Sequence, residues 1–241
     1  LLSGLSHGVG DVTDRKRNQQ FTNGVSPDAP HRALLVALDE WVSQGITPPE
    51  SKVPRRTDNS AFAVPQPGSQ TGYVPQTELG WPTIPGTTYN GLITTRYLLD
   101  FGEDFENGIL SNYPPSLVGR PAYPIFVSKV DQDGNELAGI RLPEVAAPVA
   151  TTTGWALRRT EFSENEGGES DGQNIPFKTT KTERIAAHDP RLSLEERYQD
   201  HNGYVQEVTR VAQNLGKQRF LLAADVQRYI EAAQASNILL S

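Results

Sequence analysis

Residues 4–8 read GLSHG, and the class of fold depends on which polar residue of this stretch carries chemistry. The spacing G-x-S-x-G is typical of a sharp strand-to-helix turn that presents a serine, here Ser6. A histidine that follows an apolar segment, here His7 after LLSGL, is instead typical of a loop at the end of a strand. The residues on either side of the stretch decide between the two interpretations.

Ser6 does not have the sequence context of a nucleophile. In that role a helix begins directly after the serine, and several strand–helix units follow to carry the acid and the histidine. Residues 9–30 are polar and aperiodic, and Gly10 and Gly24 interrupt them. The pattern farther along predicts one β-hairpin and a helical tail, so we do not favour a catalytic Ser6.

His7 fits the loop interpretation better. LLSGL then forms the tail of a strand, and Gly4 and Gly8 allow the chain to turn and present the imidazole. In α/β-hydrolases the histidine is the last triad member in the chain and a helix follows it. The alternative is a loop histidine without a catalytic role.

A helix is predicted from about residue 29 to residue 44. Asp28 is a suitable N-cap, and Gly45 with Pro48 beyond it marks the end. We expect one buried stripe along this helix. Its apolar residues are Leu34, Leu35, Leu38, Trp41 and Val42.

The remaining chain divides into a loop-rich part and a helical part. Residues 46–90 are rich in Pro, Gly, Thr and Ser and are expected to form extended coil. Asp133-Gly134 between two apolar runs predicts a hairpin, with about residues 124–131 facing 136–142 and a positive φ at Gly134.

Two capping boxes introduce the C-terminal helices. They are Thr180-x-x-Glu183 and Ser193-x-x-Glu196. Two apolar faces farther on predict two helices that are joined by residues 216–222 and pack against each other as a hairpin. These faces comprise Val205, Val208, Ala212 and Leu215, and Val226, Tyr229, Ile230 and Ala233.

The order of several stretches resembles the C-terminal half of a bacterial family of alpha/beta hydrolase domain-containing proteins. The resemblance covers nearly the whole chain and is most specific at GNELAGIRLPEV (134–145) and TTTGWALR (151–158). The family is expected to carry a GTQHG-like loop where this chain has GLSHG. The resemblance thus implies that His7 is the catalytic histidine, and that the serine and the acid lie upstream of residue 1.

We therefore expect an α/β protein that forms the C-terminal portion of an α/β-hydrolase fold. Residues 1–50 would end the core, 51–175 would form a loop-rich, β-containing cover, and 176–241 a helical region. The expected function is hydrolysis of an ester or related small acyl substrate without a cofactor, in partnership with the upstream polypeptide. The alternative is a non-catalytic accessory or binding module.

Composition excludes several classes. The net charge of −7 and the lack of a basic stripe argue against nucleic acid as a partner. No apolar run is long enough for a membrane span. Cysteine is absent, which excludes disulfides, and methionine is absent even at position 1, so we expect a processed product or a fragment. The compartment is left open, with a secreted or periplasmic location favoured over the cytoplasm.

The sequence contains three further candidate sites. Asp131, Asp133 and Asn135 alternate as in a calcium loop, but Glu136 and Leu142 stand where that loop needs Gly and Glu. His188-Asp189 and Asp200-His201 lie beside predicted helix ends, where such residues are common, so no metal is expected.

Trp155 is the remaining candidate. The residue lies beside two arginines, and one interpretation is a core tryptophan with surface charges. The other interpretation places this segment over the active site, with Trp155 lining the substrate pocket. The resemblance favours a special role for this segment without saying which.

Overall fold

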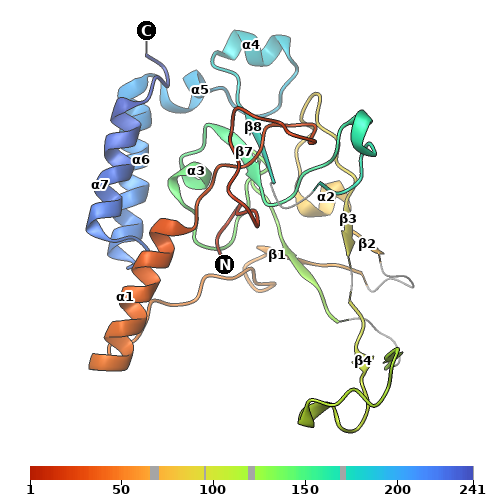
Figure 1. Cartoon of the computed structure of the whole chain (residues 1–241). Coiled ribbons are helices and arrows are strands. Elements are labelled where there is room, and N and C mark those ends of the chain that lie inside the picture. The colour runs from red at the N-terminus through yellow and green to blue at the C-terminus, as the bar shows by residue number, and fades with distance from the viewer. Residues whose placement is uncertain (66–70, 95, 119–122, 169–171, 241) are drawn as a thin grey trace.

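The computed structural model describes residues 1–65, 71–94, 96–118, 123–168 and 172–240. Three helices form a column along one side of the molecule: α1 (Asp28–Gln44), α6 (His201–Lys217) and α7 (Ala223–Ala235) (Figure 1). The N-terminal segment, α3 (Pro143–Ala146), β7 (Ala150–Thr153) and β8 (Gln173–Pro176) occupy the centre.

The described residues contain four two-stranded sheets, all of them antiparallel. β7 pairs with β8, and Thr151 lies opposite Ile175. The other pairs are β1 (Ala61–Ala63) with β6 (Phe126–Ser128), β2 (Thr71–Tyr73) with β3 (Leu92–Thr94), and β4 (Leu99–Asp100) with β5 (Ser116–Leu117). The structure therefore mixes helices with small sheets, in agreement with an α/β class.

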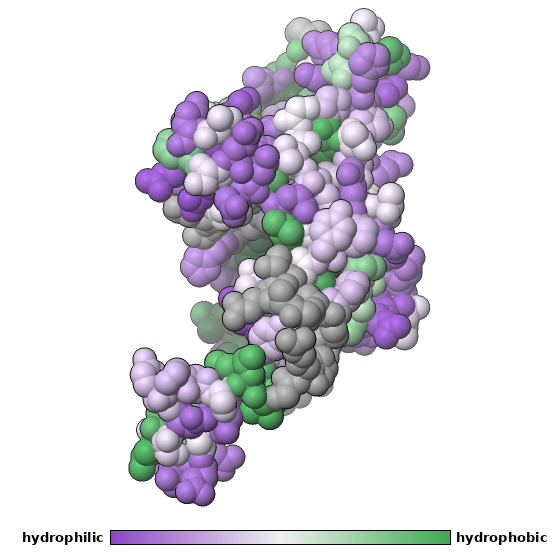
Figure 2. Space-filling model, turned by 90° about the vertical axis from the view of Figure 1, so that its right-hand side faces the viewer, coloured by the Kyte–Doolittle hydropathy of each residue, from purple (hydrophilic) through white to green (hydrophobic). Residues whose placement is uncertain are grey.

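Short helical segments lie between some of these strands and between β8 and α6. They are α2 (Gln76–Leu79), the 3₁₀ turns η1 (Phe105–Asn107) and η2 (Thr160–Phe162), α4 (Lys181–Ala186) and α5 (Leu194–Tyr198). The coil predicted for residues 46–90 thus contains β1, β2 and α2. The segment with β4, η1 and β5 projects below the body with apolar side chains among polar ones (Figure 2), and Phe105 is exposed there.

Helix α1 confirms the predicted element but not its predicted buried face. Ala29, Ala33 and Ala37 face the interior, whereas Trp41 is 54 % exposed and Val42 is 80 % exposed. Leu34 alone of the predicted stripe packs against the core, at its margin. Pro27, not Asp28, is the N-cap residue. Gly45 ends the helix as predicted, and its backbone adopts the left-handed conformation.

The C-terminal helices follow the predicted pattern. Both capping boxes form, at the starts of α4 and α5. Helices α6 and α7 pack against each other. Their buried apolar residues share one cluster with Val25 and Leu142 from earlier in the chain. None of the described helices is both long and apolar enough to cross a membrane.

The turn at Asp133-Gly134 is present, but the hairpin around it is short. The amide of Gly134 donates to the carbonyl of Asp131, and φ of Gly134 is +83°. Antiparallel pairing extends only to Val130 opposite Glu136 and to a bond from the Leu137 amide to the Lys129 carbonyl. Farther from the turn, residues 126–128 (β6) pair with β1 instead. The prediction that residues 124–131 face residues 136–142 along their whole length was therefore wrong.

Candidate functional site

The segment of residues 3–8, called here the His7 loop, is held to the centre of the molecule by its backbone. Leu2 forms a parallel bridge with Ile140, and the Ser3 amide donates to the Ile140 carbonyl at 3.1 Å. The Ser3 hydroxyl donates to the Ala138 carbonyl. These contacts fix the start of the loop against the chain that follows the Asp133-Gly134 turn.

Gly4 is clamped from two sides. Its amide donates to Oε2 of Glu136 at 2.8 Å, and its carbonyl accepts a bond from Nδ2 of Asn23 at 2.5 Å. The φ of Gly4 is +66°, and a Cβ there would lie 3.0 Å from the Thr152 carbonyl oxygen. Both the backbone conformation and the close approach therefore require glycine.

Asn23 is a residue that sequence reasoning missed. It is fully buried, and its Nδ2 bonds both Gly4 and the carbonyl of Thr153 at 2.9 Å, while its Oδ1 accepts from the Val25 amide. The side chain thus joins the His7 loop to the end of β7. Only the dipeptide Asn23-Gly24, a turn signal, marks this position in the sequence.

Ser6 is not presented to a substrate. Its side chain is buried, and its hydroxyl donates to the Gly8 carbonyl at 2.5 Å. No helix follows it before α1 begins at Asp28. The structure therefore lacks the strand–turn–helix geometry of a nucleophile at this position, in agreement with the sequence argument.

His7 lies exposed on the same loop. Within the part of the chain that the structure describes, its imidazole makes no hydrogen bond and no ion pair. The neighbouring Ser3, Gly4 and Ser6 are buried, so the ring projects from a loop whose backbone is fixed. This arrangement leaves both ring nitrogens available to groups outside these residues.

Trp155 lines a cavity of about 460 Å³, called here the Trp155 cavity. The Trp155 ring packs against Trp81 at 5.1 Å and Tyr89 at 6.0 Å between ring centroids. Burial raises the pKa of Tyr89 to about 12, and its hydroxyl donates to the Val74 carbonyl. The cavity is mostly apolar and of the size of a small-molecule pocket.

The Trp155 cavity and the His7 loop are adjacent. Glu136 lines the cavity and accepts the bond from the Gly4 amide. A Cβ on Gly154, the residue before Trp155, would lie 2.4 Å from the Leu5 carbonyl oxygen. The backbone before Trp155 and the His7 loop are therefore in close contact. Burial raises the pKa of Glu136, although the Gly4 amide partly opposes this shift.

The candidate metal ligands are used in other ways. Asp131 and Asp133 form ion pairs with Arg141 and Arg197. Asp189 pairs with Arg191, and Asp200 caps α6 by accepting from the Gly203 amide. Throughout the described ranges, no three His, Cys, Asp or Glu side chains converge as metal ligands.

Comparison with known proteins agrees with an α/β class. Residues 5–231 match the family described as the alpha/beta hydrolase domain, and the chain belongs to this family. Membership indicates hydrolase activity in general terms. No curated protein and no solved structure matches the chain.

Proposed function

We propose that this chain is the C-terminal portion of a serine hydrolase that cleaves an ester or a related acyl substrate, with His7 as general base. The observation that carries the proposal is the exposed His7 imidazole on a backbone clamped by Glu136 and Asn23. A triad histidine needs a fixed position and an accessible ring. Family membership supports the same assignment.

In the proposed mechanism His7 accepts the proton of a serine hydroxyl as that oxygen attacks the acyl carbon. It then returns the proton to the leaving group. The serine, the carboxylate that orients the imidazole and the oxyanion hole would lie on polypeptide upstream of the His7 loop. In the described part of the chain none of the four histidines bonds a serine, and the ring of His201 contacts the carbonyls of Gln234 and Ile238 instead.

The outer face of α1 supports the proposal that the serine lies on another stretch of polypeptide. Its exposed apolar residues are Leu35, Val36, Leu38, Trp41 and Val42. A contiguous apolar face on a helix is typical of a surface that packs against another element. We propose that this face covers the sheet that carries the serine, as the helix after the histidine does in α/β-hydrolases. The division of the chain into three regions, residues 1–50, 51–175 and 176–241, belongs to the same proposal.

The proposal is tested by a fluorophosphonate, which reacts with activated serines. We expect the native protein to be labelled on a serine outside residues 1–241, and pretreatment with an unlabelled serine inhibitor to prevent this labelling. A label on Ser6 would make GLSHG the nucleophile turn. Complete lack of labelling would favour the alternative, a binding module that uses the Trp155 cavity.

We further propose that the Trp155 cavity receives the acyl group. Replacing Trp155 with alanine should raise KM for long-chain p-nitrophenyl esters by about tenfold or more, since about 1.5–3 kcal/mol of apolar contact is lost per large side chain. The turnover number should change less, and Trp155→Phe should restore most of the affinity. Phe105→Ala, on the projecting segment, is the control. An unchanged KM for every acyl length would remove Trp155 from the pocket.

A further inference from the structure

A second cavity, called here the Glu144 cavity, lies between the C-terminal helices and β7. Its volume is about 320 Å³, at the lower end of the range of about 300–1,000 Å³ for small-molecule pockets. Its walls are largely aliphatic, with Pro143, Ala147, Val149, Val208 and Ala233 among them. The hydrolase proposal uses neither this cavity nor its residues.

One carboxyl group in this wall lacks a complete set of partners. Oε2 of Glu144 is enclosed and accepts no hydrogen bond from the protein. The hydroxyls of Tyr229 and Tyr204 both lie close enough to this carboxyl group to feel its charge. Burial raises the pKa of Glu144, because an enclosed carboxylate without a cation is costly.

The surroundings do not supply that cation. Among the described residues that line the cavity there is no Lys, Arg or His. Arg32 and Arg228 are near Tyr229, but both pair with Asp225, at 2.5 and 2.6 Å. A positive charge opposite the Glu144 carboxylate would therefore come from a molecule inside the cavity.

We propose that the Glu144 cavity binds a small apolar molecule that carries one primary ammonium group. Glu144 receives the ammonium as a carboxylate, and the aromatic rings of Tyr204 and Tyr229 flank the charge. The aliphatic walls cover the hydrocarbon part of the molecule. An anionic ligand is disfavoured, because its charge would face the carboxyl group without compensation.

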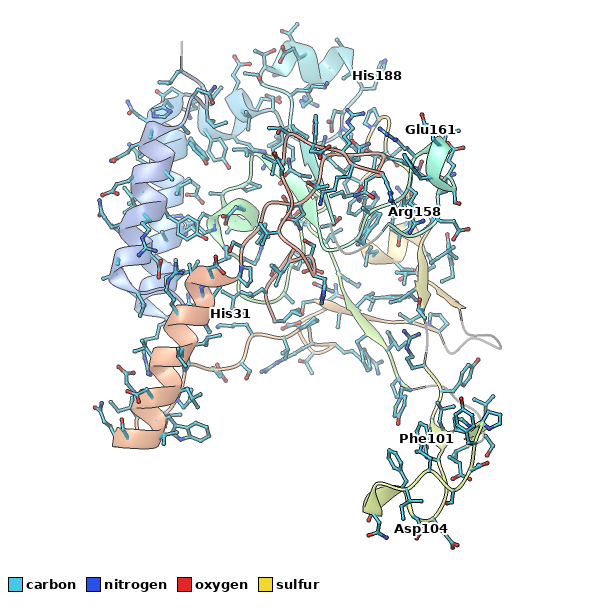
Figure 3. The ribbon with its side chains drawn as sticks, viewed as in Figure 1. His31, Phe101, Asp104, Arg158, Glu161 and His188 are labelled. Carbon is cyan, nitrogen blue, oxygen red and sulfur yellow. The ribbon has the colours of Figure 1, made fainter. Side chains whose placement is uncertain are left out.

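Calorimetric titration of the native protein with benzylamine tests this site. We expect saturable binding to one site, and affinity for benzyl alcohol weaker by about tenfold or more, because the alcohol has the same ring but no charge. Glu144→Gln should weaken benzylamine binding by a similar factor. The matched control is Glu161→Gln, at an exposed carboxylate far from α6 and α7 (Figure 3).

A second variant tests the same cavity without changing the buried residue Glu144. Ala232 is an exposed α7 residue at the edge of the cavity, so Ala232→Phe should block entry without disturbing the core. Loss of benzylamine binding in this variant supports the site. Equal binding of amine and alcohol, binding that neither variant changes, or no saturable binding overturns the proposal. Fluorophosphonate labelling is unaffected in every case, which separates this outcome from failure of the hydrolase proposal.

Discussion

The variant His7→Ala is expected to lose about four orders of magnitude or more in kcat, as removal of a triad member does. Without the imidazole, the nucleophilic serine keeps its proton during attack and the leaving group receives none. Binding of a non-hydrolysable substrate analogue should change little, because the proposed acyl pocket lies at Trp155 and Glu136. Steady-state kinetics measures the loss of kcat, and calorimetric titration of the variant and the native protein with the analogue measures binding.

Two matched variants accompany this prediction. Ser6→Ala should retain most of the activity, since the Ser6 hydroxyl contacts only the Gly8 carbonyl within the loop. His188→Asn changes another exposed histidine, at the far end of the molecule beyond α4 (Figure 3), and asparagine tolerates the positive φ there. If Ser6→Ala abolishes activity and His7→Ala does not, the assignment of His7 is wrong.

The largest stability effect is expected at Arg191, which is 2 % exposed. Its guanidinium donates to both carboxylate oxygens of Asp189, to Oγ1 of Thr151 at 2.8 Å and to the Ile175 carbonyl at 2.9 Å. It therefore connects β7 and β8, and β7 leads directly to Gly154 and Trp155. Arg191→Met should lower the free energy of unfolding by about 3–5 kcal/mol, because Asp189 remains buried without its partner.

The contribution of Asp189 to the pH dependence of stability should have the opposite sign in Arg191→Met from that in the native protein. Burial alone would raise the pKa of Asp189, but hydrogen bonds from Arg191 outweigh burial and hold the pKa below its ordinary value. In the native protein the pair therefore stabilises the fold above the unfolded-state pKa and is lost as pH falls through the lowered pKa. In Arg191→Met burial dominates, so protonation of Asp189 in acid restores stability instead.

Chemical denaturation of two further variants checks this result. Arg191→Met with Asp189→Asn should recover part of the loss, because the double variant has no orphaned charge. Arg210→Met removes a surface pair with Glu207 and should cost about 0.5 kcal/mol or less. A loss at Arg191 no greater than at Arg210 would contradict a structural role for the buried pair.

Sequence alone determined the features that depend on neighbouring residues. The capping boxes of α4 and α5, the left-handed end of α1 at Gly45 and the turn at Gly134 follow from local hydrogen bonding and from the freedom of glycine. The periodicity of α6 and α7 similarly predicted their packing. The family could also be predicted from the sequence, since the resemblance rests on the order of residues. The match over residues 5–231 confirmed membership of the alpha/beta hydrolase domain family.

Tertiary structure decided everything that depends on distant partners. An apolar pattern on α1 cannot tell which face meets this chain, and the alanine face lies inward because small side chains allow close approach to the core. β6 pairs with β1, more than sixty residues earlier, instead of completing the hairpin. The local sequence does not predict the roles of Asn23, Glu136 and Glu144. These roles arise only where separate segments enclose a polar group and leave it specific partners or none.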